Sequence, residues 1–260
     1  MRLALAVEYD GTDFLGWQRL SHGRTVQAEV ETALSRVANH PVEIVCAGRT
    51  DSGVHAAGQV AHFDTDAVRT DYAWMMGCNS LLPDGVAVRW LQPVVDEFHA
   101  RYRATSRRYR YRILNRQARP GLWQRFMAWE RRELDVDAMR VAAQALLGEQ
   151  DFSAFRTSQC QAKHPKRTMR EILVRRFDDE IQLEVEANAF LHHMVRNIVG
   201  SLIPIGRGER PVEWLAEVLA GRDRALAGPT APAQGLCFLG PRYPSIYGLP
   251  DLMPPAGASR

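Results

Sequence analysis

The chain carries one glycine-rich loop whose residue types could do chemistry. Residues 46–55 read Cys-Ala-Gly-Arg-Thr-Asp-Ser-Gly-Val-His and join two strand-like segments. Small residues let a loop backbone approach a ligand closely, and a carboxylate at Asp51, between Gly48 and Gly53, can be presented at the loop tip. The same residues also fit a purely structural role, in which Asp51 caps a short helix and His55 is a hydrogen-bonded loop histidine. Phosphate cradling is disfavoured, because the Gly-Lys-Ser/Thr ending of a Walker loop is missing.

A second candidate group lies near residue 190. His192 and His193 are neighbours in a segment predicted as helix, so their side chains should point about 100° apart and should not bind one metal ion together. No Cys, Asp or Glu stands at ligand spacing beside them, and no metal site is predicted. Arg196 is either a surface arginine or an inward one that needs a carboxylate partner, for which Asp51 is one candidate. The apolar residues of this helix are interpreted as core: Phe190, Met194, Ile198 and Leu202.

Arginine dominates the basic residues. There are 33 Lys and Arg against 30 Asp and Glu, and only Lys163 and Lys166 are lysines. Residues 99–132 hold eleven arginines and one acid, with Tyr, Trp and Phe interleaved, and residues 163–176 hold six basic residues and one acid. Guanidinium groups match phosphate oxygens, and aromatic rings among them suit nucleic acid better than a membrane surface. The alternative is a genome-wide arginine bias with a solvated, arginine-rich strand face.

Composition narrows the class of protein further. The chain has 260 residues, of which 46% are hydrophobic and 24% charged, which excludes collagen-like, low-complexity and largely disordered proteins. No apolar run approaches the roughly 20 residues of a membrane-spanning helix, and the N-terminus turns acidic at Glu8, too early for a secretory signal. We therefore expect a cytoplasmic protein with no membrane segment. The cysteines are scattered without a CxxC pair and are expected to be free thiols: Cys46, Cys78, Cys160 and Cys237.

Hydrophobic periodicity predicts the elements that position these groups. In the first half the order is β-α-β-β-α-β, a ferredoxin-like unit. Its elements are a strand over 2–9, a helix capped by Thr25 and ending at 38, strands over 42–46 and 59–63, a helix over 71–81 and a strand over 86–95. The second half repeats this order with one additional helix. Its elements are a strand over 108–114, a helix over 135–147, a hairpin of 171–177 and 181–187, helices over 190–205 and 212–219, and a strand over 235–239.

These elements predict an α/β (α+β) protein of two ferredoxin-like domains. We expect the first domain to span residues 1–104, the second residues 105–243, and a Pro- and Gly-rich tail residues 244–260. A cleft between two such halves is the natural place for a site.

Several motifs, in order along the chain, resemble those of the TruA family of pseudouridine synthases. The loop Gly48-Arg49-Thr50-Asp51-Ser52-Gly53-Val54-His55 looks like the family's catalytic loop, with Ser52 where many members have Ala. The other motifs are Glu8-Tyr9-Asp10-Gly11, Gly16-Trp17-Gln18-Arg19, Phe98-His99-Ala100-Arg101, Arg107-Arg108-Tyr109-Arg110-Tyr111, residues 188–197 and Gly235-Leu236. The resemblance covers the chain up to about Tyr243.

The resemblance implies an activity and a set of site residues. It implies a pseudo-twofold fold with a central, mostly antiparallel sheet and an active-site cleft between the halves. It implies an isomerase that converts uridine to pseudouridine at positions 38, 39 and 40 in the anticodon stem-loop of tRNA, as a homodimer and without cofactor or metal. Asp51 corresponds to the nucleophile and Tyr109 to a substrate-contacting tyrosine. Arg196 and Arg49 are implied as guanidinium groups that favour the charged form of the carboxylate.

Two other functions remain open from the residues themselves. A non-catalytic RNA-binding or chaperone module with the same fold would need no reactive Asp51. An enzyme that hydrolyses glycosidic bonds could use Asp51, but no second carboxylate accompanies it in the loop. Spacing also leaves Tyr109 and Tyr111 undistinguished, because both point to the same face of one predicted strand.

Overall fold

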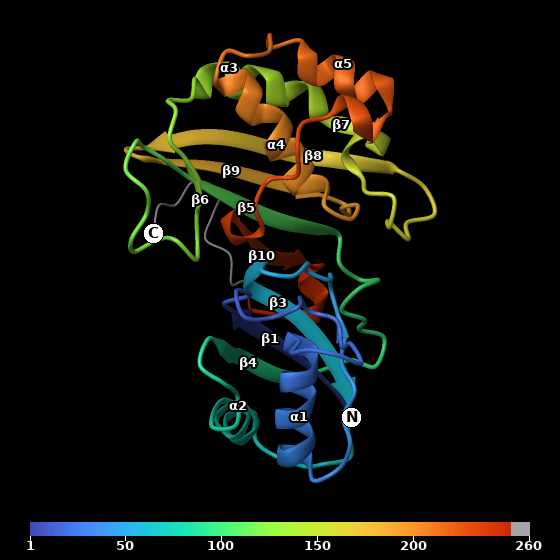
Figure 1. The fold of residues 1–260 in the computed structure, drawn as a ribbon. Coiled ribbons are helices and arrows are strands. Elements are labelled where there is room, and N and C mark those ends of the chain that lie inside the picture. Colours follow the sequence, from blue (N-terminus) through green and yellow to red (C-terminus); the bar gives the residue numbers. More distant parts are fainter. Residues whose placement is uncertain (251–260) are drawn as a thin grey trace. The chain divides into compact units, whose positions relative to one another are not determined.

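The computed structural model describes residues 1–250, and the chain forms two compact units. Unit 1 comprises residues 1–106 together with the chain from Phe238 onward, and unit 2 comprises residues 107–237. Each unit combines a mostly antiparallel sheet with helices (Figure 1). The predicted α/β class is therefore confirmed. Of the predicted tail, residues 251–260 lie outside the described residues.

Unit 1 follows the predicted order β-α-β-β-α-β. Its elements are β1 (Arg2–Tyr9), α1 (Val26–Ala38), β2 (Val45–Cys46), β3 (His55–Asp64), α2 (Asp71–Asn79) and β4 (Val86–Val94). The strands are ordered β4-β1-β3-β10, where β10 is Leu236–Arg242, and β2 pairs with β3. β1 lies antiparallel to both β3 and β4. Because Leu3, Leu5 and Val7 are at most 1% exposed, β1 forms the centre of this unit's core.

The two helices of unit 1 begin where the sequence predicts. Val26, Val30 and Leu34 recur at helical spacing on α1 and are fully buried. Thr25 is the N-cap in an extended conformation, although its hydroxyl does not make the capping hydrogen bond. α2 ends two residues earlier than expected. The reason is Asn79, whose side-chain amide exchanges hydrogen bonds of 2.9 and 2.7 Å with the backbone of Val88 in β4.

Unit 2 contains the elements predicted for the second half except its last strand, and it has two further strands. The strand predicted over 235–239 is β10, most of which belongs to unit 1. The elements of unit 2 are β5 (Ser106–Asn115), β6 (Ala128–Glu130), α3 (Val136–Ala143), β7 (Gly148–Asp151), β8 (Lys166–Phe177), β9 (Glu180–Ala187), α4 (Met194–Gly206) and α5 (Trp214–Gly221). The strands are ordered β5-β9-β8-β7, and β6 pairs with β5 in parallel. The three helices lie on the same side of this sheet (Figure 1). The short strands β6 and β7 were not predicted.

Two helices of unit 2 are shorter than their periodicity predicts. α3 ends at Ala143, and a 3-10 turn over Gln144–Leu146 completes the expected length. α4 starts at Met194 instead of Phe190, because His193 adopts a left-handed conformation with φ of 61° and ends the irregular segment before the helix. Among residues 1–250, no helix is long and apolar enough to span a membrane.

Candidate active site

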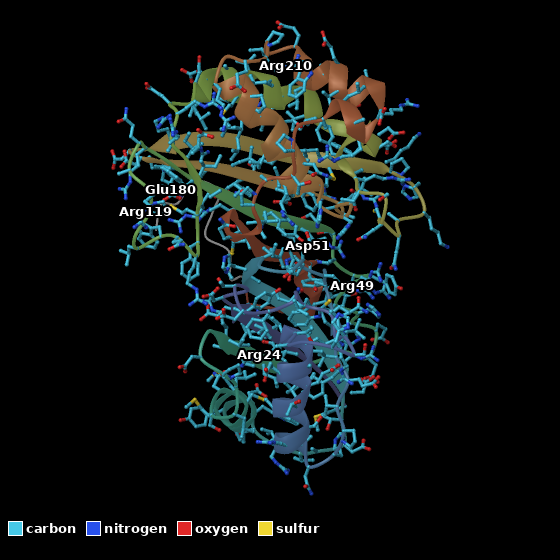
Figure 2. The ribbon with its side chains drawn as sticks, viewed as in Figure 1. Arg24, Arg49, Asp51, Arg119, Glu180 and Arg210 are labelled. Carbon is cyan, nitrogen blue, oxygen red and sulfur yellow. The ribbon has the colours of Figure 1, made fainter. Side chains whose placement is uncertain are left out.

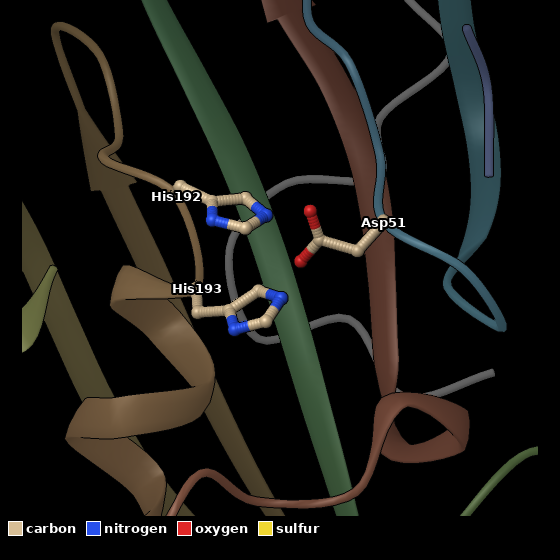
Figure 3. Close-up of side chains that lie close together, drawn as sticks. All are labelled: Asp51, His192 and His193. Carbon is tan, nitrogen blue, oxygen red and sulfur yellow. The ribbon is translucent and has the colours of Figure 1, made fainter. Parts of the chain in front are cut away.

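Asp51 lies on the loop between β2 and β3 and is half-buried. The backbone turns at this point, since the N–H of Val54 donates to the carbonyl of Asp51 at 3.1 Å and Gly53 has a φ of 75°. The described structure contains no helix between β2 and β3, so the interpretation of Asp51 as a helix cap is wrong. Figure 3 shows the carboxylate extending away from its loop. The loop therefore presents Asp51 in the manner that its glycines suggested.

A glycine of the preceding segment lies directly against this loop. Gly16 has a φ of 95°, and a Cβ built on it would lie 2.6 Å from the carbonyl oxygen of Thr50 and 3.0 Å from the carbonyl carbon of Asp51. The N–H of the next residue, Trp17, donates to the same Thr50 oxygen at 3.1 Å. Only glycine allows this approach, because the conformation and the space both exclude a side chain.

Side chains fix both ends of the Asp51 loop. The hydroxyls of Tyr9 and Thr50 are 2.7 Å apart in a buried hydrogen bond. At the loop's end, His55 Nδ1 accepts the N–H of Gly11 at 3.0 Å, and His55 is only 5% exposed. His55 is therefore hydrogen-bonded, as the structural interpretation holds, but it is the first residue of β3 and not a loop residue. At the loop's start, the amide of buried Gln59 bonds to both backbone groups of Gly48.

Arg49 and Cys46 lie beside the start of the loop. Arg49 is exposed and extends from the same loop as Asp51 (Figure 2). Burial raises the pKa of the Cys46 thiol to about 11, while the positive charges of Arg49 and Arg101 oppose this shift. Cys46 is consequently protonated at neutral pH, and it is a free thiol as predicted.

In unit 2, the structure distinguishes the two tyrosines of β5. Tyr111 is fully buried, and its hydroxyl donates to the carbonyl of Pro232 at 2.8 Å. Burial raises the pKa of the Tyr111 hydroxyl well above its usual range. Tyr109 is 8% exposed and contacts the ring of Phe190 edge-on, with centroids 5.0 Å apart. Tyr111 is therefore a packing residue, which leaves Tyr109 as the candidate for substrate contact.

Arg196 lies on the first turn of α4 and is half-buried. Its Nε donates to the carbonyl of Ala231 at 2.7 Å, and the N–H of Ala231 donates back to the carbonyl of Arg196 at 3.1 Å. One helix position further, Asn197 is fully buried and receives hydrogen bonds from Thr230 at 2.7 Å and Arg224 at 3.2 Å. These contacts fasten the segment around residue 230 to α4, which gives Arg196 a defined orientation.

His192 and His193 differ from the sequence expectation. They precede α4 instead of lying on it, and their rings stack with centroids 4.0 Å apart (Figure 3). The expectation that they point about 100° apart is wrong, because the left-handed conformation of His193 replaces the helical geometry. His192 Nδ1 lies 2.5 Å from the hydroxyl of Thr157. Within the described residues of either unit taken alone, no three metal-ligating side chains gather.

The arginines of β5 hold the sheet of unit 2 together. Arg108, Arg110 and Arg112 alternate with buried residues along the strand and face away from Tyr109. Arg108 is 1% exposed and pairs with Glu184 at 2.5 Å and with Glu171 at 3.3 Å. Arg110 and Arg112 form ion pairs of 2.6 Å with Glu184 and Glu180. These three groups are paired internally, so the arginine count of residues 99–132 overstates the charge available to a polyanion.

Residue types alone did not predict which residues hold the Asp51 loop in place. These residues are Tyr9, Gly16 and Gln59, and the sequence motifs that contain Tyr9 and Gly16 indicated no contact with this loop. The available signal was a glycine before a bulky buried residue, Gly16-Trp17, which is typical of a close backbone approach. The partner of that approach is 34 residues away in the chain at Thr50, and only the fold reveals it.

Comparison with known proteins defines the class as pseudouridine synthases, an isomerase class. A sequence profile described as tRNA pseudouridine synthase matches residues 5–103 and 142–244. The chain belongs to the tRNA pseudouridine synthase family. The predictions of a pseudouridine synthase fold and of an isomerase are therefore confirmed.

Full-length relatives agree with this assignment. A protein named tRNA pseudouridine synthase A from Stenotrophomonas maltophilia (strain R551-3) is 61% identical over 251 residues, which cover 96% of this chain and 98% of that protein. A protein of the same name from Xanthomonas euvesicatoria pv. vesicatoria (strain 85-10) is 60% identical over 252 residues, with the same coverage. A third, from Xanthomonas campestris pv. campestris (strain B100), is 58% identical over 252 residues.

Proposed function

We propose that the chain converts uridine to pseudouridine at positions 38, 39 and 40 in the anticodon stem-loop of tRNA, with Asp51 as the nucleophile. The observation that carries this proposal is the Asp51 loop, a half-buried carboxylate on a turn whose flanking backbone is fixed by Gly16, Tyr9 and His55. A catalytic side chain must be held within a fraction of an ångström, and these contacts supply that support. Identities of 60–61% over 96% of this chain with proteins named tRNA pseudouridine synthase A support the choice of substrate.

The reaction gives the carboxylate a clear task. The bond between C1′ and N1 breaks, and the positive charge that develops on the ribose is stabilised or captured by a carboxylate, as in retaining glycosidases. The uracil then turns in place, C5 bonds to C1′, the C5 proton leaves to a base, and N1 regains a proton. No second carboxylate is required, because the departing uracil is reused and no water is activated.

We assign three further residues to the substrate. Tyr109 stacks on the uracil, supported from its side by Phe190, and its hydroxyl or a water helps to remove the C5 proton. Arg196 and Arg49 act on the phosphates or on the Asp51 carboxylate, since guanidinium groups favour nearby negative charge. The hydrogen bond from Arg196 Nε to the carbonyl of Ala231 supports a defined orientation of this guanidinium. The reaction as proposed uses no cofactor and no metal ion.

The substrate nucleotide leaves its stack before it reacts. A uridine in a stem must flip out, at a cost of a few kcal/mol that phosphate contacts offset. Exposed arginines of the basic runs, such as Arg119 and Arg125, are suited to those contacts. Because phosphate contacts release counterions, binding of tRNA should weaken steeply with salt. We also propose that the protein acts in the cytoplasm as a homodimer, with one tRNA contacting both subunits.

The experiment that tests this proposal maps the modified positions. Unmodified tRNA transcripts carrying a single uridine in the anticodon arm, at position 37, 38, 39, 40 or 41, are incubated with the protein and analysed for pseudouridine. We expect pseudouridine at 38, 39 and 40 only. Modification at another position, or RNA binding without modification as expected of a non-catalytic module, would contradict the proposal.

A further inference from the structure

Four aromatic rings of unit 1 form a continuous stack from the core to the surface. Phe98 is fully buried and meets His62 edge-on at 5.9 Å. His62 lies 4.7 Å from His99, and His99 lies 4.3 Å from Tyr102 with ring planes 30° apart. Tyr102, the outermost ring, is 75% exposed. The proposed reaction uses none of these four residues, which we call the ring stack.

Hydrogen bonds hold the histidines of the ring stack in place. His99 Nδ1 accepts the N–H groups of both Arg101 and Tyr102, each at 3.2 Å. His62 Nδ1 accepts the N–H of Ala100, also at 3.2 Å. An Nδ1 atom that accepts carries no proton, so both rings are neutral in this arrangement. Burial lowers the pKa of His62 to about 4 and also lowers the pKa of His99, which keeps both rings uncharged at neutral pH.

The inner end of the ring stack is anchored by the C-terminal part of unit 1. The rings of Tyr243 and Tyr247 each lie 5.2 Å from that of Phe98. The hydroxyl of Tyr243 donates to the carbonyl of Ala100 at 2.6 Å. Tyr102 is thus an exposed ring supported from beneath, and ordering it on a ligand costs little conformational entropy.

Cations flank the outer end of the ring stack. The Arg101 guanidinium carbon lies 5.7 Å from the centroid of the Tyr102 ring, and both side chains are exposed. Arg103, one residue further, is also exposed, and its Nε donates to the carbonyl of Glu97 at 3.2 Å. The side chains of Asp96 and Glu97 are the exposed acids of this segment. An uncharged aromatic ring beside the Arg101 guanidinium offers stacking to a base and attraction to a neighbouring phosphate.

We propose that Tyr102, supported by the ring stack, is a stacking site for an unpaired nucleobase of the bound tRNA. This proposal rests on the function proposed above for its choice of RNA. Proteins that bind single-stranded nucleic acid combine exposed aromatic rings with a basic surface, and every base has a face that can stack. Stacking on Tyr102 adds affinity for RNA without distinguishing one base from another. The reason is that no side chain has to form hydrogen bonds with the edge of the base.

The test compares the affinity of an unmodified tRNA transcript for wild-type protein and for variants, by filter binding over a range of salt concentrations. Tyr102→Ala should weaken binding roughly five- to 150-fold, the range for loss of one stacked base. Tyr102→Phe should bind within about twofold of wild type, because stacking needs the ring and not the hydroxyl. The slope of log affinity against log salt should stay the same in Tyr102→Ala and fall by about one in Arg101→Ala.

Tyr72→Ala provides the matched control, because Tyr72 is 69% exposed on α2 and belongs to no part of the site. It should bind tRNA as wild type does. Tyr102→Ala that binds within about twofold of wild type would overturn the proposal, as would a Tyr102→Phe variant as weak as Tyr102→Ala. Sedimentation that shows Tyr102→Ala dissociating an oligomer of the wild-type protein would also overturn the proposal. Tyr102 would then contact a second copy of the chain and not RNA. The measurement reports binding alone, so it is separate from whether uridine is isomerised.

Discussion

Gly16 packs so closely against Thr50 that an alanine Cβ would lie 2.6 Å from the Thr50 carbonyl oxygen. Thr50 immediately precedes Asp51, so Gly16, which lies 35 positions before Asp51 in the chain, limits where the Asp51 carboxylate can lie. The N–H of Trp17 adds a hydrogen bond of 3.1 Å to the same oxygen. The Asp51 loop is therefore shaped from outside by the segment between β1 and α1.

Gly16→Ala should lower the free energy of unfolding by more than the replacement of a glycine with a positive φ does by itself. The substitution combines a positive φ, which costs about 1 kcal/mol, with a backbone clash, so we expect a loss of about 2–4 kcal/mol in the free energy of unfolding. Gly148→Ala is the matched control, since Gly148 has a φ of 83° but no atom within 4 Å of its Cβ position. Urea unfolding of both variants measures the difference. Equal losses would show that the close approach is unimportant.

Tyr109→Phe and Tyr111→Phe should separate catalysis from packing. Tyr111→Phe removes a buried hydrogen bond to Pro232 and should cost about 1–2 kcal/mol in stability, with little change in the rate per folded molecule. Tyr109→Phe should leave stability and tRNA affinity near those of wild type and lower the rate of pseudouridine formation. Thermal unfolding and single-turnover rates measure both effects. A Tyr109→Phe variant with the wild-type rate would remove its hydroxyl from the mechanism.

Glu184→Gln should destabilise unit 2 strongly. Glu184 is 5% exposed and accepts hydrogen bonds from both Arg108 and Arg110. Loss of its negative charge leaves the buried Arg108 guanidinium without the main charge that neutralises it. Removal of one partner of a buried ion pair typically costs about 3–5 kcal/mol. Glu171→Gln is the control, because Glu171 is more exposed and its distance to Arg108 is 3.3 Å. Urea unfolding should show a much larger loss of stability for Glu184→Gln than for Glu171→Gln. The reverse order would contradict the view that Glu184 is the main partner of Arg108.

His62 should make stability depend on pH below neutrality. Burial lowers its pKa to about 4 in the folded protein, against about 6.5 for an exposed histidine. As the pH falls, His62 binds a proton in the unfolded chain before it does so in the folded protein. The contribution of His62 to the free energy of unfolding is therefore complete above pH 6.5 and is lost between about pH 6.5 and 4. We expect a loss on the order of 2 kcal/mol over this range that is absent in His62→Gln, measured by urea unfolding at each pH. Parallel pH profiles of the two proteins would refute this.

The element order could be predicted from the sequence because most elements satisfy local rules. β1 and α1 match their predicted bounds, since an apolar run and an apolar stripe at helical spacing define them without help from the rest of the chain. β6 and β7 were missed because three and four residues are too few to show a period. The start of α4 was misplaced because apolar residues continue through Phe190 and Leu191, while the break is a backbone conformation at His193.

The site was predictable as a set of residue types but not as an arrangement. The glycines on either side of Asp51 identify a loop that can carry a functional carboxylate. Which tyrosine of β5 packs and which is available depends on Pro232 and Phe190, which lie far away in the sequence. Likewise, the ion pairs of Arg108 depend on the register of β5 with β9, which hydrophobic pattern alone does not specify.

The central claim is that the carboxylate of Asp51 carries out the chemistry, and release of tritium from tRNA labelled at C5 of uridine tests it most directly. Tritium enters water only when C5 gives up its hydrogen. We predict that Asp51→Asn binds tRNA within a few-fold of wild type and releases no tritium, while the exposed control Asp66→Asn releases it at the wild-type rate. Substantial release by Asp51→Asn would contradict the account.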